Sequence, residues 1–292
     1  MLFLALCLTV AVLCWALTAF LVPLLWPVVR RSVSALSPGF AADCVFLLQI
    51  LPLLVSVSVL SLLVIPGFVV WEPDHTQESV NPWLAAVSVF ALGLILTTAR
   101  RLYQDLRRQP IISPDKPFIA VLGCLRQKIV VTEAAHVLLS REELRAVLRH
   151  EAVHIERRDN FRLLAARLIS MLTLNPRVWK EMESVRGQLT EFAADSFAAT
   201  DDDSALDLAQ ALVKVARDFP AAEYQFASSI LPRRNSIQER VLRLLNRSSQ
   251  PADSAGYLAV FALLMLALVI TAALHHDLQF FCYQVLERMV SL

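Results

Sequence analysis

Glycine and charged residues are scarce in this chain of 292 residues. Only six residues are glycine and no short sequence period repeats, which argues against collagen-like, propeller and most β-barrel architectures. Charged residues make up 18% of the chain and hydrophobic residues 57%, and the mean hydropathy is +0.56. This balance excludes a disordered chain and an ordinary soluble enzyme. A mainly α-helical membrane protein is the class that remains.

The cysteines and the net charge indicate no disulfide framework, thiolate metal site or nucleic-acid partner. The chain has five cysteines and no Cys-x-x-Cys pair, so neither a disulfide framework nor a thiolate metal site is indicated. The 27 basic and 26 acidic residues leave a formal net charge of +1. Because no global positive field results, we expect no direct binding of nucleic acid.

Four uncharged stretches are long enough to cross a lipid bilayer, which takes about 20 apolar residues per helix. They lie at residues 1–29, 44–71, 79–98 and 254–276. Buried core helices are the alternative reading of such runs, and their length argues against it for the first two. The sequence therefore predicts a multi-pass protein with three spans within residues 1–99, a folded domain at 100–253, a fourth span at 254–276 and a short external tail at 277–292.

The positions of lysine and arginine predict the orientation, since positive residues near span ends stay in the cytoplasm. Arg30 and Arg31 follow the first span, and four arginines from Arg100 to Arg108 follow the third. The connection between the second and third spans is acidic. We therefore expect both termini outside and the domain at 100–253 in the cytoplasm. Trp26, Trp71 and Trp83 are expected near membrane interfaces, where amphipathic rings gather.

The cytoplasmic domain begins with two β-prone runs, at 117–122 and 128–131, which predict a hairpin around Gly123. Ser140 and Glu143 then match a capping box, so a helix is expected from this point to about Arg158. The domain is thus predicted to be α+β.

His150-Glu-Ala-Val-His154 stands on that helix. Two histidines four residues apart project from one helix face and can reach one Zn²⁺, and Glu151 between them is placed to act on a water molecule. The alternative is a surface helix with two unrelated histidines. The capped helix and the presence of only six histidines in the chain favour the metal site.

A catalytic zinc site needs a third protein ligand. No histidine follows His154 at close range, so a distant carboxylate is expected. A second helix is predicted from Asn175 as the N-cap and Pro176 at the first position. It carries Glu191 and Asp195 on one face, among small residues that allow close approach. Two other glutamates of this helix compete for the ligand position: Glu181 and Glu183.

The chain from Phe118 to Asp195 resembles the BlaR/MecR-type membrane zinc metallopeptidases and, more distantly, the HtpX-like peptidases. The residues that carry the resemblance are His150-Glu-Ala-Val-His154, Asp159, Asn175-Pro176 and Glu191-Phe-Ala-Ala-Asp195. It implies a zincin-like domain in which His150, His154 and Glu191 bind Zn²⁺. By the same resemblance Glu151 is the general base. Asp159 and Asp195 are then the carboxylates that hold the site from behind.

Members of this group that act in signalling cleave themselves or help to inactivate a cytoplasmic repressor after an external domain senses a β-lactam. Here only residues 277–292 follow the fourth predicted span, without a Ser-x-x-Lys motif. A penicillin-binding domain is therefore not expected, and a separate sensor subunit would have to replace it. HtpX-like relatives place a His-Pro pair before an arginine that matches Arg240, and this chain lacks that pair. The oxyanion donor is therefore left open among Arg233, Arg234 and Arg240.

Together these features predict a zinc metalloendopeptidase of the bacterial cytoplasmic membrane, of the gluzincin type. Its expected substrate is a cytoplasmic or membrane-proximal protein, with a DNA-binding repressor or the chain itself favoured by the resemblance. Two alternatives stay open: a quality-control peptidase for membrane proteins, and a non-catalytic signalling or scaffold subunit. Glu151 argues against a purely structural zinc site, which has no use for a base. Expected partners are the lipid bilayer, a sensor subunit and a second copy of the chain.

Overall fold

The computed structural model of the chain describes residues 2–71, 81–107, 116–170, 172–173, 175–218, 234–246 and 276–291. Most of these residues are helical, with one short hairpin. The elements are α1 (Leu2–Val33), α2 (Pro38–Val59), the π-helical η1 (Leu60–Val64), α3 (Ile65–Trp71), α4 (Pro82–Arg107), β1 (Ile119–Leu122), β2 (Lys128–Val131), α5 (Glu133–Leu138), α6 (Arg141–Glu156), α7 (Asp159–Ser170), α8 (Pro176–Ala198), α9 (Asp202–Asp218), α10 (Arg234–Leu245) and α12 (His276–Ser291).

Three helices are long and apolar enough to cross a membrane: Phe3–Val33, Pro38–Val70 and Pro82–Gln104. The second joins α2, η1 and α3 end to end. These helices coincide with the first three predicted spans. Residues 254–275 of the fourth predicted span lie outside the described residues. The expected external tail forms α12, which packs against α3 and η1.

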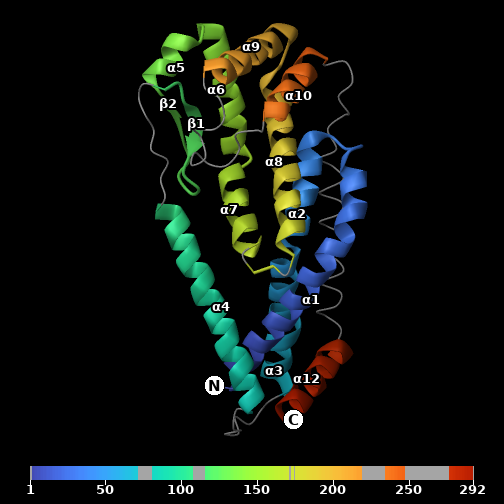
Figure 1. Cartoon of the computed structure of the whole chain (residues 1–292). Coiled ribbons are helices and arrows are strands. Elements are labelled where there is room, and N and C mark those ends of the chain that lie inside the picture. The colour runs from blue at the N-terminus through green and yellow to red at the C-terminus, as the bar shows by residue number, and fades with distance from the viewer. Residues whose placement is uncertain are drawn as a thin grey trace.

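The hairpin, α5, α6, α9 and α10 gather at one end of the molecule, and the two chain termini lie at the other (Figure 1). The C-terminal ends of α1 and α4 point toward the domain. Because these ends carry Arg30, Arg31, Arg100 and Arg101, the positive charges lie on the side of the domain.

The first two span helices do not stop at the domain but form part of its core. A helix of 33 residues, as α2 to α3 make together, is about 50 Å long, against about 30 Å of hydrocarbon in a bilayer. The parts of α1 and α2 that exceed the thickness of the bilayer pack on α7 and α8. The buried residues of this core are Val22, Trp26, Val33, Ala41, Val45, Ile169, Trp179 and Met182. Trp26 is 3% exposed, so its ring packs in this core.

The predicted hairpin is present. β1 and β2 pair antiparallel, with Ile119 opposite Val131 and Leu122 opposite Lys128. Gly123 turns the chain with φ +89°, and a Cβ atom there would lie 2.3 Å from the carbonyl oxygen of Arg126. Only glycine therefore fits the turn that brings β2 back along β1.

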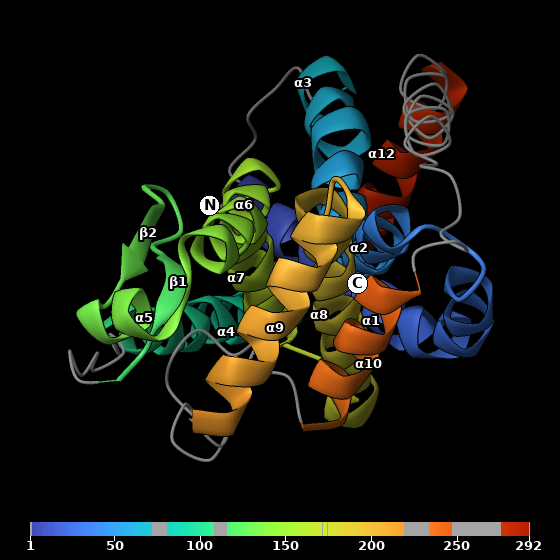
Figure 2. The same cartoon turned by 90° about the horizontal axis from the view of Figure 1, so that it is seen from above.

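A second core holds α6, α8, α9 and α10 together. Its buried residues are Ala146, Ala198, Ala199, Ala205, Leu208, Ala209 and Leu244. Seen from above, α9 and α10 lie over α8 (Figure 2). The small side chains allow close helix packing, which brings α6 and α8 side by side.

The capping box at the start of α6 is formed as predicted. Ser140 Oγ accepts a hydrogen bond from Glu143 N at 3.2 Å, and Glu143 Oε2 accepts one from Ser140 N at 2.8 Å. Buried Glu143 also pairs with Lys214 of α9. The helix ends at Glu156, slightly before the predicted Arg158.

Replacing Ser140 with alanine should lower the free energy of unfolding by about 1 kcal/mol, because Glu143 N loses its acceptor. Denaturant unfolding of the full chain in detergent micelles measures this loss. Ser32→Ala is the control, since that exposed hydroxyl only bonds Val28 O within its own helix. Equal stability losses in the two variants would contradict the capping role.

Candidate metal centre

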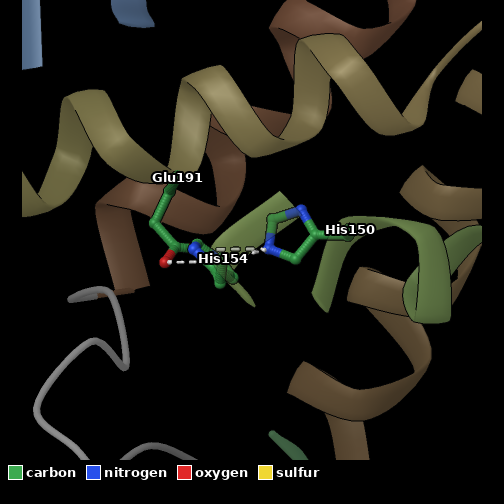
Figure 3. A group of neighbouring side chains, drawn as sticks. All are labelled: His150, His154 and Glu191. Carbon is green, nitrogen blue, oxygen red and sulfur yellow. Dashed lines mark hydrogen bonds and ion pairs between the residues drawn. The ribbon is translucent and has the colours of Figure 1, made fainter. Parts of the chain in front are cut away.

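Three side chains from two helices meet in one buried place. His150 and His154 project from one face of α6, and Glu191 reaches them from α8 (Figure 3). The two Nε2 atoms are 3.1 Å apart. Glu191 places Oε2 3.5 Å from His150 Nε2 and Oε1 3.7 Å from His154 Nε2.

These distances fit a metal ion. Ligands placed tetrahedrally around Zn²⁺ at their usual bond lengths lie about 3.3 Å from one another, and the three observed separations span 3.1 to 3.7 Å. The three residues are all buried. Among the residues that the structure describes, this is the one group of three or more histidine, cysteine or acidic side chains arranged to hold a metal.

Two aspartates hold the histidine rings from behind. Asp159 Oδ2 lies 2.8 Å from His154 Nδ1, and Asp195 Oδ1 lies 3.0 Å from His150 Nδ1. The contact of Asp159 is a hydrogen bond, which fixes the ring of His154 and leaves its Nε2 for the metal, whereas Asp195 lies at ion-pair distance from His150. Arg158, in a left-handed conformation with φ +54°, turns the chain between α6 and α7. That turn places Asp159 beside the last turn of α6.

The carboxylates make the centre attractive to a cation. Burial alone would lower the pKa of His150, but contacts with Asp195 and Glu191 raise it to about 10. Burial alone would raise the pKa of Glu191, but Arg240 and the two histidines lower it to about 2. Glu191 is therefore ionised at neutral pH, as a metal-ligating carboxylate must be.

Arg240 of α10 anchors the acidic side of the centre. Its Nε and Nη2 donate to Asp195 at 2.7 and 2.6 Å, and its Nη1 lies 2.8 Å from Glu191 Oε2. Arg240 is 4% exposed. Burial alone would lower the pKa of Arg240, but the carboxylates of Asp195 and Glu191 raise it above its usual value. Arg240 therefore stays charged. All three guanidinium nitrogens contact these carboxylates, a role that was not predicted from the sequence.

Glu151 lies next to the three candidate ligands but is not one of them. Its Oε2 accepts a hydrogen bond from Val121 N in β1 at 3.1 Å. Asn160 Nδ2 donates to Val121 O and Gly123 O, both at 2.9 Å, and so fixes this strand beside α6. Burial raises the pKa of Glu151. Neither the hydrogen bond from Val121 nor the role of Asn160 was predicted.

The remaining candidates of the sequence lie elsewhere. Glu181 and Glu183, the alternative ligands, pair with Arg30 and Arg167 instead. Arg233 lies outside the described residues, and only the backbone of Arg234 is described.

The sequence profile of peptidase family M48 matches residues 118–260. No curated protein and no solved structure matches the chain. The matched segment contains the hairpin, both ligand helices and every residue of the centre described above. The closer likeness to BlaR/MecR-type or HtpX-like peptidases stays a prediction. Residues 118–260 therefore resemble a peptidase family M48 domain, and the peptidases of that family are metal-dependent.

Proposed function

We propose that the chain is an integral-membrane zinc metalloendopeptidase. The observation that carries the proposal is the set of three ligand atoms 3.1 to 3.7 Å apart, with a glutamate that is not a ligand beside them. Imidazole and carboxylate ligands suit Zn²⁺, and three protein ligands leave a coordination position for a reactant. A zinc ion held there would supply Lewis-acid polarisation of a peptide carbonyl and lower the pKa of water.

Glu151 is the proton carrier in this proposal. It accepts a proton from the attacking water and later gives it to the leaving amine. Its raised pKa brings it closer to neutral pH, which favours both transfers. The Val121 N–H donates a hydrogen bond to one carboxylate oxygen of Glu151, which orients the carboxylate.

The site supports a substrate close to the membrane. α8, which carries Glu191, packs along α2, so the centre stays near the bilayer. The arginines at the ends of α1 and α4 favour a cytoplasmic domain with both termini outside. We propose a cytoplasmic or membrane-proximal protein as the substrate, with a DNA-binding repressor or a second copy of the chain as first candidates. A separate sensor subunit would supply the stimulus.

Metal removal tests the proposal. The full chain in nanodiscs is treated with a chelator and then resupplied with Zn²⁺, and cleavage of the chain itself, of cytoplasmic repressors and of an unfolded membrane protein is followed by mass spectrometry. We expect cleavage to stop and to return with about one zinc per chain. Glu191→Gln should not recover, whereas Glu183→Gln on the same helix should.

The substrate that is cut separates the proposed roles. Cleavage of a repressor or of the chain itself supports signalling, and cleavage of the unfolded membrane protein alone supports quality control. A chain that binds zinc and cuts none of them would favour the scaffold role. A chain that binds no zinc would refute the proposal.

A further inference from the structure

The N-terminal end of α2, which carries Gly39 and Asp43, lies directly behind the metal centre. Asp43 Oδ1 accepts a hydrogen bond from Arg157 Nη2 at 2.9 Å, and the same nitrogen donates to Gly39 O at 3.2 Å. Arg157 Nε lies 3.9 Å from Asp159 Oδ1. Asp159 in turn contacts the ligand His154 at 2.8 Å. A membrane helix is thus connected to a metal ligand through three side-chain contacts.

We propose that Asp43 and Arg157 are positioning residues for the metal centre, through which helix α2 sets the orientation of His154. The inference rests on the metallopeptidase function proposed above. It adds that the centre is completed by a helix outside the matched family segment, since Asp43 precedes residue 118.

The balance of charges explains why Asp43 matters. Asp43 also accepts a hydrogen bond from Arg162, so it faces two guanidinium groups. Asp159 also feels the charge of buried Arg186. Within the described residues, Arg157 Nε has no hydrogen-bond partner, so the guanidinium is held by Asp43 and Gly39 at ion-pair distance from Asp159. Without Asp43, Arg157 is free to close on Asp159 and draw that carboxylate away from His154.

The same end of α2 touches the second ligand helix. A Cβ atom on Gly39 would lie 3.2 Å from Arg157 Nη1 and 3.8 Å from the Cβ atom of Ala193. Ala193 stands two residues after the ligand Glu191 on α8. Since this end of α2 contacts Arg157 at the end of α6 and lies close to Ala193 of α8, a shift of it would act on both helices that carry the ligands.

Metal affinity tests the inference in the full chain. Zn²⁺ is titrated against a chromogenic chelator, and the visible spectrum of the Co²⁺-loaded chain reports ligand geometry. Asp43→Asn should weaken Zn²⁺ binding about tenfold, as loss of a partner behind a metal ligand does, and should change the Co²⁺ spectrum. The double variant Asp43→Asn/Arg157→Gln should lose no more Zn²⁺ affinity than the weaker-binding single variant. Both substitutions interrupt the same connection from α2 to His154, so their effects should not add.

Arg30→Gln is the matched control. Arg30 and Glu181 form another ion pair between a membrane helix and the domain, but this pair is exposed and does not reach His154. Its loss should leave metal affinity unchanged. If Asp43→Asn does not yield folded protein, Arg157→Lys, which keeps the charge but loses the fork between Asp43 and Asp159, takes its place in the comparison.

The outcomes separate this inference from the proposed function. Wild-type chain that binds no zinc refutes both. Wild-type chain that binds zinc and cleaves protein, with Asp43→Asn as tight a binder as Arg30→Gln, overturns the inference alone. Losses that add in the double variant overturn it as well, because Asp43 and Arg157 would then act separately.

Discussion

Replacing Glu151 with glutamine should lower kcat/KM for peptide cleavage by about 10³-fold while the metal stays bound. Glutamine has nearly the same shape and its oxygen can still accept the hydrogen bond from Val121 N. It cannot take a proton from water, however. His150, His154 and Glu191 are untouched, so metal content should equal that of the wild type.

The control for this variant is Glu156→Gln, which makes the same change on the exposed side of the same helix. Cleavage rates and zinc content are measured for both variants in nanodiscs. We expect the control to retain full activity. A Glu151→Gln variant that cleaves at the wild-type rate would remove Glu151 from the chemistry, and one that loses zinc would make it a ligand.

Replacing Arg240 with methionine should lower the free energy of unfolding by about 3–5 kcal/mol, the cost of leaving a buried charge without its partner. Glu191 and Asp195 would then face each other with no guanidinium between them. Thermal unfolding of the full chain in detergent micelles measures the loss. Saturating Zn²⁺ should recover part of it, because the bound cation restores a positive charge and binds the folded chain.

Arg243→Met on the same helix is the control. Arg243 is exposed and lies over the ring of Phe192 at 4.1 Å, a contact worth about 0.5–1 kcal/mol. The predicted order is therefore a large loss at Arg240 and a small loss at Arg243. Equal losses of unfolding free energy in the two variants would mean that the buried carboxylates do not depend on Arg240. Zn²⁺ would then stabilise both variants equally.

The parts of the site set by local sequence were predictable. The two histidines share a helix face because they are four residues apart, and Ser140 and Glu143 mark where that helix begins. Glu191 was chosen among several glutamates because small residues follow it. The structure agrees with that reasoning, since Ala193 and Ala194 are buried against neighbouring helices.

Arg240 shows what spacing alone does not reveal. It pairs with a residue 45 positions away, and no local rule links the two. One signal was present, because Arg240 lies on the same helix face as Ile237, Val241 and Leu244. A charged residue in an apolar stripe is expected to have a buried partner.

The contact of α2 with the domain could not be predicted from the sequence for a different reason. Lipid-facing and protein-facing residues of a span are both apolar, so the run from 44 to 71 gives no sign of which residues pack on α8. Asp43, immediately before that run, was the visible clue. For the same reason the sequence did not show that Trp26 packs in the core beside α8.

X-ray absorption at the zinc edge of the purified full chain tests the proposed metal centre. We expect one bound zinc with nitrogen and oxygen ligands at about 2.0–2.1 Å, including the outer-shell signal of two imidazoles, and loss of this spectrum in Glu191→Gln. A sulfur shell at about 2.3 Å, or a chain that retains no zinc, would contradict a centre made of His150, His154 and Glu191.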